Sequence, residues 1–388
     1  MPDGFSMMVP SDLGQLDHSA LFTEAAVEAY RAEPARAAEL RAAAPNHDES
    51  VADFTLRHFG PEVLDRVAAP LLSGVFGGDV RRLSVRAVMP GFGEMEREHG
   101  SLISALQAKR LRPAEQGSIF TTLRSGLGTL IQRLEAAIPP HWIRRNHTVK
   151  GIHRNTQPEM PAWTLHTSTT GKHHGSDTFD AIFLATPLDA SRRLIAQVDE
   201  DAAHLLPTDS SSAVLVAFCY PDASLVPLPG GFGFLVPPRL DSERALDPSS
   251  NLLLACTFVD QKFPARVPPN GRMVRAFFGG AAAERVARCN NDEIAAIARL
   301  ELARALNATM PISGAAPTPA PPPVLTVVRR WPHSLPQYTV GHLDRAAELH
   351  SRLAAHPGLT LLGNALHGVG LPDLIRDARA AANAATQA

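Results

Sequence analysis

The spacing of apolar residues changes once along this 388-residue chain, near residue 115, from helical periodicity to short strand-like runs. Residues 48–60 carry apolar side chains at helical spacing behind Asp48, a candidate helix cap, and residues 61–78 open a second helix with Pro61. Beyond residue 115, most apolar runs are of strand length and are separated by turn residues. This pattern predicts an α/β fold that also contains α+β elements, in which a helical block precedes the sheets.

Two groups of strands are predicted after the helical block. The first contains WIRRNHTVKGI, PAWTLHT and FDAIFLATP, with the polar turn TGKHHGSD between the last two, and it predicts a mixed sheet with a hairpin insert. The second predicts an antiparallel sheet next to the helix NDEIAAIARLELARAL, and its strands are SSAVLVAFCY, GGFGFLVP, NLLLACTF, RMVRAFFGG and PVLTVVRRW. The run SGAAPTPAPPPV, residues 313–324, is typical of a stiff surface connector.

Charge and hydropathy exclude several classes of function. A formal net charge of −2, from 37 Lys+Arg and 39 Asp+Glu, provides no field that would gather nucleic acid, so no nucleic-acid partner is expected. The opening MPDGFSMMVP lacks the features of a secretory signal, and the longest nearly pure apolar runs are shorter than the roughly 20 residues of a membrane helix. We therefore expect a folded protein inside the cell that does not cross a membrane.

The chain offers no metal site and no nucleophile motif. Cys219, Cys256 and Cys289 lie far apart without a CxxC pair, which indicates thiols in a reducing compartment. The 16 histidines lack HxxxH and HExxH spacing, and no GxSxG occurs, so we expect surface or core histidines and no catalytic side chain.

The C-terminal run LTLLGNALHGVGLPDLIR, residues 359–376, combines a strand, a glycine turn and a helix. Its glycines permit close backbone approach to a ligand, and Pro372 suits the first helical position. Such a turn presents backbone N–H groups and the positive end of a helix to an anionic group, but a plain strand-to-helix turn fits the pattern equally well. No GxGxxG turn occurs anywhere in the chain, so it has no Rossmann phosphate turn of its own.

Five segments, taken together, resemble the oxygen-dependent protoporphyrinogen and coproporphyrinogen oxidases, which are FAD enzymes of haem synthesis within the monoamine oxidase superfamily. They are LLSGVFGGDVRRLSVRAVMP (71–90), EREHGSLI (96–103), GGFGFLVP (230–237), LPQYTVGHLDR (335–345) and GNALHGVGLPDLI (363–375). The resemblance implies a porphyrinogen substrate, which gives six electrons in three steps to FAD, and O2 as the acceptor that yields hydrogen peroxide. The flavin then carries the difficult chemistry, and the protein supplies position and electrostatics.

The resemblance also implies site residues. Cofactor contacts correspond to Val149 near the adenine and to Asn364, Val369, Gly370 and Leu371 beside the isoalloxazine and ribityl chain. Substrate contacts correspond to Gly74, Leu235 and Phe277, whose small or flat apolar character suits a large macrocycle.

Four segments follow from these assignments. Residues 1–114 form a helical block that faces the substrate or a membrane, and residues 206–354 form an antiparallel-sheet substrate domain. Residues 115–205 and 355–388 form a discontinuous flavin domain of the FAD/NAD(P)-binding type that is incomplete in this chain.

The incompleteness is inferred from the first residues. MPDGFSMMVP resembles a segment that family members carry inside their chains, beyond the block with the GxGxxG turn. The strands next to that block are expected to be FDAIFLATP and LTLLGNA, and without it they would expose edges or a face that is otherwise buried. We therefore expect the chain alone to bind FAD weakly or not at all. Three explanations stay open: a start assigned too far downstream, a split enzyme, or a non-catalytic tetrapyrrole-binding remnant.

Further alternatives stay open at this point. Another flavin amine oxidase or desaturase with a different apolar substrate is the second interpretation of the enzyme. The apolar face of residues 58–78 fits either peripheral contact with the inner face of the cell membrane or a core helix of a cytoplasmic protein. A homodimer is one option for the assembly, and the choice between protoporphyrinogen IX and coproporphyrinogen III is not decided.

Overall fold

The computed structural model describes residues 4–17, 19, 21–110, 121–157, 159–169, 174–236, 252–309 and 320–387. The chain forms two compact units, which are described separately: unit 1 holds residues 1–130 and 211–333, and unit 2 holds residues 131–210 and 334–388. Most of the expected connector 313–324 and the first residues of the expected polar turn lie outside the described residues.

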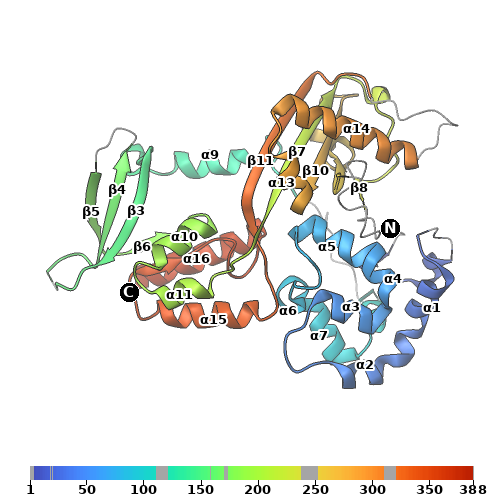
Figure 1. Ribbon diagram of the computed structural model, residues 1–388, viewed down its shortest axis with the longest axis horizontal. Coiled ribbons are helices and arrows are strands. Elements are labelled where there is room, and N and C mark those ends of the chain that lie inside the picture. Colours follow the sequence, from blue (N-terminus) through green and yellow to red (C-terminus); the bar gives the residue numbers. More distant parts are fainter. Residues whose placement is uncertain are drawn as a thin grey trace. The chain divides into compact units, whose positions relative to one another are not determined.

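The first part of unit 1 is helical, as predicted (Figure 1). Two short strands, β1 (Phe5–Ser6) and β2 (Val9–Pro10), precede the helices, and a π-helical turn (Leu64–Ala68) joins the fourth helix to the fifth. The helices are α1 (Glu24–Ala32), α2 (Ala37–Ala43), α3 (Val51–Phe59), α4 (Pro61–Val63), α5 (Ala69–Phe76), α6 (Val85–Val88), α7 (Pro90–His99) and α8 (Leu102–Arg110).

The cap of α3 differs from the one expected. Ser50, not Asp48, caps this helix, because Ser50 directly precedes the first helical residue and its hydroxyl accepts from the N–H of Asp53 at 3.0 Å. Asp48 lies two residues earlier and accepts instead from the N–H of Arg86 at 3.4 Å.

The second part of unit 1 is the predicted antiparallel sheet. Its order is β11-β7-β10-β9-β8, and β7 with β10, β10 with β9, and β8 with β9 pair antiparallel. Helix α14 covers one face, where Phe218 and Phe278 meet Ile294 and Leu302 in a buried core (Figure 1). The elements are β7 (Ser210–Tyr220), β8 (Gly233–Leu235), β9 (Ala255–Phe258), α12 (Val259–Lys262), β10 (Arg272–Gly279), α13 (Gly280–Val286), α14 (Asn291–Thr309) and β11 (Leu325–Pro336).

The two faces of this sheet differ because successive side chains of a strand point to opposite sides. On β10, Val274, Ala276 and Phe278 are buried under α14, whereas Arg275 and Phe277 lie on the other side and are only partly buried. We call this second side, which carries Leu235, Ala255, Thr257, Arg275 and Phe277, the open face.

Unit 2 contains two small sheets. One is the antiparallel order β3-β4-β5, and the other pairs β6 with β12 in parallel, with Thr360 opposite Phe183. FDAIFLATP therefore supplies β6 to a parallel pair with LTLLGNA, and not to one mixed sheet with WIRRNHTVKGI and PAWTLHT as predicted, because its strand pairs with β12 instead. The strands are β3 (His147–Arg154), β4 (Trp163–Thr169), β5 (His174–Phe179), β6 (Ile182–Leu184) and β12 (Leu359–Leu361).

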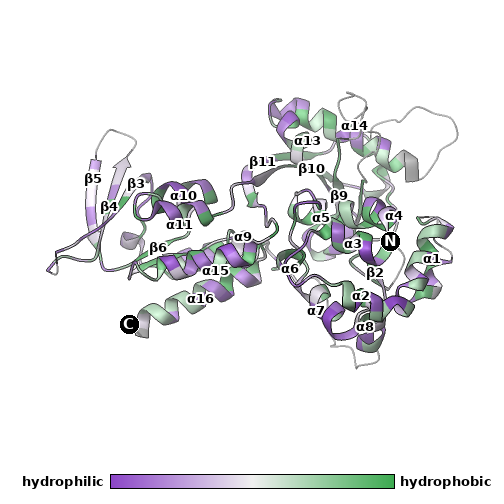
Figure 2. Ribbon diagram, turned by 60° about the horizontal axis from the view of Figure 1, so that its bottom comes forward, coloured by the Kyte–Doolittle hydropathy of each residue, from purple (hydrophilic) through white to green (hydrophobic). Residues whose placement is uncertain are grey.

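Helices complete unit 2: α9 (Gly128–Ala136), which crosses the boundary between the units, α10 (Leu188–Ile195), α11 (Glu200–Leu205), α15 (His342–Leu353) and α16 (Leu371–Gln387). Helix α15 is amphipathic, with alternating hydrophilic and hydrophobic residues along it (Figure 2). Its Leu349 and Leu353 join a core that includes Trp163 and Ile195.

One predicted turn was wrong. Residues 174–177 of the polar segment TGKHHGSD belong to β5, which pairs with β4 from His174 opposite Ser168 to Phe179 opposite Trp163. The side chains of β5 are nearly all exposed, so their polarity carries no sign of burial, and backbone pairing to β4 holds the segment as a strand.

Candidate functional site

The C-terminal turn of unit 2 lies between β12 and α16. Gly363 has a φ of +120°, a conformation that favours glycine, and Asn364 follows it. Val369 and Gly370 come directly before α16, which begins at Leu371, one residue earlier than expected. The four residues that the resemblance assigned to the flavin ring therefore lie on one turn.

Two aromatic side chains hold this turn in place. The hydroxyl of Tyr338 donates to the carbonyl of Asn364 at 2.7 Å, and Nε2 of His342 donates to the carbonyl of Leu366 at 2.7 Å. The two rings stack with centroids 4.0 Å apart. Burial raises the pKa of Tyr338, so its hydroxyl stays a donor at neutral pH. The sequence motif LPQYTVGHLDR contains both residues, but the strand and helix pattern gave no sign of this role.

The geometry of the turn fits one end of a flavin. Gly363, Gly368 and Gly370 carry no side chain, and Leu371 at the start of α16 is 44% exposed. Helix α16 has 17 residues, and its N-terminus, the positive pole of the helix dipole, lies at this turn, where it would favour negative charge on a bound ring. Since the chain has no GxGxxG, this fit covers the ring and ribityl end, not the pyrophosphate.

Val149 lies elsewhere in the same unit. It sits on β3 opposite Thr167, where the pairing of β3 with β4 shifts between Val149 and Gly151. Its side chain packs against the core of unit 2. The adenine contact proposed for it would use the backbone of this irregular strand.

The three expected substrate residues meet on the open face of unit 1. Leu235 and Phe277 both pair with Ala255 from opposite sides, so they stand in one row across the sheet. A Cβ added to Gly74 would lie 3.1 Å from Cδ2 of Leu235, so Gly74 packs against the same row. Tertiary structure thus brings together residues from three distant segments.

The position of Gly74 differs from the expected turn. It lies inside α5, and the helix ends at Gly77, whose φ is +65° and whose N–H donates to the carbonyl of Ser73 at 2.9 Å. A left-handed glycine at this point is the usual stop of a helix. Gly74 is therefore a helical residue that lets α5 approach β8 closely.

Two polar residues, Arg275 and Thr257, also lie on the open face, and the sequence motifs did not single them out. Arg275 donates from Nε to Oγ1 of Thr257 at 3.1 Å, and its Cζ lies 5.7 Å from the centroid of the Phe277 ring. The period-two alternation of RMVRAFFGG contained the signal, because it places Arg275 on the side of Phe277.

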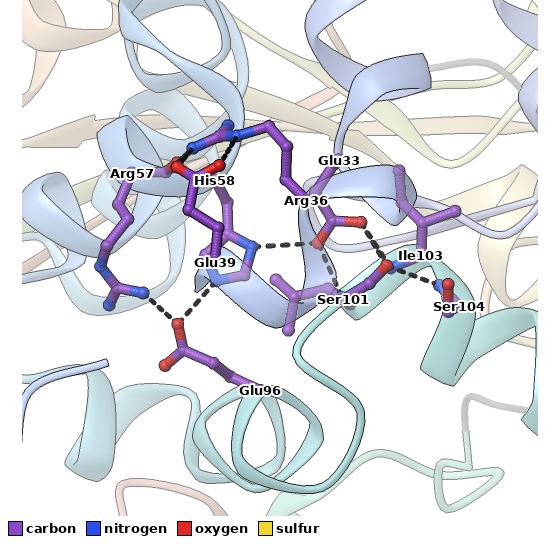
Figure 3. A network of polar contacts seen from close by, with 10 residues as sticks. Glu33, Arg36, Glu39, Arg57, His58, Glu96, Ser101, Ile103 and Ser104 are labelled. Carbon is purple, nitrogen blue, oxygen red and sulfur yellow. Dashed lines mark hydrogen bonds and ion pairs between the residues drawn. The ribbon is translucent and has the colours of Figure 1, made fainter. Parts of the chain in front are cut away.

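A second polar cluster lies in the helical part of unit 1 (Figure 3). His58 is fully buried, with Nδ1 3.0 Å from Oε1 of Glu33 and Nε2 2.9 Å from Oε1 of Glu96. Burial by itself would lower the pKa of His58, but the hydrogen bonds to both carboxylates outweigh it and raise the pKa. Two carboxylates on the two ring nitrogens indicate a protonated imidazolium, since only that form donates from both.

The remaining partners complete this cluster. Glu33 accepts from the N–H of Leu102 at 2.7 Å and from the hydroxyl of Ser101, so it caps the N-terminus of α8. Arg57 binds Glu96 and Glu49. Each of these charges therefore has an opposite charge beside it, and the cluster joins helices of the block.

The described part of the chain contains neither a cluster of metal ligands nor a membrane-spanning helix. No group of three or more potential ligands gathers there that would hold a metal ion. None of the helices in that part has both the length and the apolarity to cross a bilayer.

Comparison with known proteins points to one family. The family model for flavin containing amine oxidoreductase matches residues 8–386. Coproporphyrinogen III oxidase of Bacillus subtilis is 28% identical over 391 residues, covering 98% of this chain and 76% of that protein. The chloroplastic protoporphyrinogen oxidase 1 of Arabidopsis thaliana is 27% identical, covering 86% of this chain and 62% of that protein.

Solved structures agree with this fold. A structure from Exiguobacterium sp. 255-15, assigned to protoporphyrinogen oxidase, has a TM-score of 0.74 and 26% sequence identity, covering 99% of this chain and 76% of the other. Putrescine oxidase has a TM-score of 0.55 at 13% identity, covering 95% of this chain and 77% of the other, and supports the fold alone. The predicted α/β fold with α+β elements, of the flavin amine oxidase type, is confirmed.

Proposed function

From the premise that the chain belongs to the flavin containing amine oxidoreductase family, we propose that it oxidises a porphyrinogen to the porphyrin in haem biosynthesis. The relatives named coproporphyrinogen III oxidase and protoporphyrinogen oxidase support this choice. The six electrons of the reaction pass in three steps to FAD and on to three molecules of O2, which become hydrogen peroxide. We place this reaction in the cytoplasm.

The observation that carries the proposal is the row of apolar groups on the open face. Leu235 and Phe277 flank Ala255, and Gly74 leaves room beside Leu235. A flat macrocycle needs area and clearance more than hydrogen bonds, and this row offers both.

The turn after β12 is the proposed holder of the flavin, which supplies the two-electron chemistry when bound. Asn364, Val369, Gly370 and Leu371 would hold the ring and ribityl chain, and Val149 the adenine. Tyr338 fixes the Asn364 backbone, and the N-terminus of α16 places partial positive charge at the turn. In these terms, residues 115–205 and 355–388 are the flavin domain, 206–354 the substrate domain and 1–114 the helical block.

The test is oxidation by the purified chain in excess FAD, followed by porphyrin fluorescence and O2 uptake with coproporphyrinogen III and with protoporphyrinogen IX. Gly74→Ile should lower the turnover of either substrate about tenfold, because the new side chain occupies the space beside Leu235. Gly91→Ile is the matched control, since Gly91 is an exposed helical glycine with no atom within 4 Å of an added Cβ.

Other outcomes contradict the proposal in distinguishable ways. Flavin reduction by putrescine, with none by either porphyrinogen, would assign the chain to another amine oxidase. If the absorbance spectrum shows that flavin is bound, and the chain binds porphyrin without taking up O2, it is a non-catalytic tetrapyrrole-binding protein.

A further inference from the structure

A basic residue stands beside the apolar row of the open face. Arg275 lies two residues before Phe277 on β10 and points to the same side of the sheet. Its cross-strand neighbours are Thr257 on β9 and Ala217 on β7. An arginine is thus built into a strand whose opposite face is the buried core.

Arg275 forms a hydrogen bond through Nε, and its two terminal nitrogens, Nη1 and Nη2, bond to no residue that the structure describes. Nε donates to Thr257 at 3.1 Å, and the guanidinium lies 5.7 Å from the Phe277 ring centroid. Among the residues that the structure describes, no carboxylate forms an ion pair with it. Arg272 on the same strand and the other face differs, because its Nε binds Asp260 at 3.2 Å.

Two further cations lie near Arg275. Burial lowers the pKa of Arg275, and the positive charge of Arg266 lowers it further. Burial and the charge of Arg275 together lower the pKa of Lys262. Nη1 of Arg266 donates to Oγ1 of Thr122 at 3.4 Å, and a Cβ added to Gly126 would lie 3.2 Å from its Nη2. Arg275 is partly buried and Arg266 is exposed, and an anion between these two cations, which repel one another, would stabilise both.

We propose that Arg275, with Arg266 beside it, binds a carboxylate of the porphyrinogen whose ring lies on Leu235 and Phe277. This inference rests on the proposed function and deepens it. The guanidinium fork matches a carboxylate in two parallel hydrogen bonds, and its fixed position beside Phe277 sets how the ring is oriented on the face. The open face then recognises an amphipathic acid: apolar surface for the macrocycle and a basic edge for its acidic chain.

The test compares coproporphyrin III with its tetramethyl ester, which has the same ring but no carboxylate. Binding to the full chain is followed by quenching of porphyrin fluorescence in the same dilute detergent. Arg275→Gln should weaken binding of the free acid about 10- to 100-fold, the value of a charged hydrogen-bond pair, and leave binding of the ester unchanged. Ester binding also verifies that the variant is folded. Arg285→Gln, an exposed arginine on α13, is the matched control and should change neither.

Each remaining outcome overturns the inference. If Arg275→Gln binds the acid as the wild type does, Arg275 is not the carboxylate site, while the proposed function stands. If the wild type binds acid and ester equally, the open face does not recognise carboxylates. If the wild type binds neither, both the inference and the proposed substrate fail.

Discussion

Unit 1 places charge away from water in two regions, and the two regions treat it differently. In the His58 cluster of the helical block, every cation lies beside a carboxylate, and Glu33 also caps α8. On the open face of the sheet, Arg275 lies near other cations and forms no ion pair with a described carboxylate. We infer from this difference that the paired charges of the His58 cluster stabilise the fold, whereas the charge of Arg275 binds a ligand.

The largest effect on stability is expected in the His58 cluster, where every cation lies beside a carboxylate. Glu33→Ala should lower the free energy of unfolding by about 3–5 kcal/mol, because it leaves His58 with one buried partner and removes the cap of α8. Urea unfolding followed by circular dichroism measures this loss.

Glu39→Ala is the control for Glu33→Ala. Glu39 is also in the helical block, but its pair with Arg36 is exposed, so its removal should change stability little. If both variants lost the same free energy of unfolding, the buried cluster would contribute no more to stability than an exposed ion pair, which contradicts the comparison.

The two faces of β10 provide the next comparison. Phe278 is fully buried under α14, so Phe278→Leu should destabilise the protein by about 1–2 kcal/mol. Phe277→Leu, one residue away on the open face, should leave the unfolding midpoint nearly unchanged and weaken porphyrin binding. Calorimetry and fluorescence titration of both variants measure the two effects. If Phe277→Leu destabilised the protein and Phe278→Leu did not, Phe277 would belong to the core and the open face would not be a binding surface.

The smallest expected effect is a pH dependence of the free energy of unfolding, which arises in the His58 cluster. The folded-state pKa of His58 is raised, so its contribution to stability is complete below the ordinary histidine pKa of about 6.5 and is lost as pH rises through the higher folded-state value. The free energy of unfolding should therefore fall above about pH 6.5 in the wild type and fall less in His58→Gln.

The acid side of the same measurement tests Glu96. Burial opposes the charged form, but hydrogen bonds from His58 and Arg57 lower the pKa of Glu96. Its contribution is present above its ordinary pKa and is lost as pH falls through the lower folded-state value. Parallel curves for the wild type and His58→Gln on both sides would mean that His58 and Glu96 are not coupled in solution.

Much of the fold was predictable from local pattern. Helical spacing, strand alternation and turn residues placed the helical block and the antiparallel sheet, because these signals depend on residues close together in the chain. The parallel pairing of β6 with β12 joins segments far apart in the chain, and local pattern did not predict it. Strand β5 was not predictable, since its exposed polar side chains resemble those of a turn and only pairing to β4 makes it a strand.

For the site, the sequence by itself determined which kinds of side chain are present at each position. It places glycines for close approach within residues 363–370, apolar groups at 235 and 277, and an arginine beside one of them. Only the tertiary structure decided which of these meet and which charges are balanced. Gly74 reaches Leu235, His58 lies between two carboxylates, and Arg275 lies beside cations, through contacts between segments far apart in the chain. Electrostatic balance depends on distance in space, and the order of residues does not encode that distance locally.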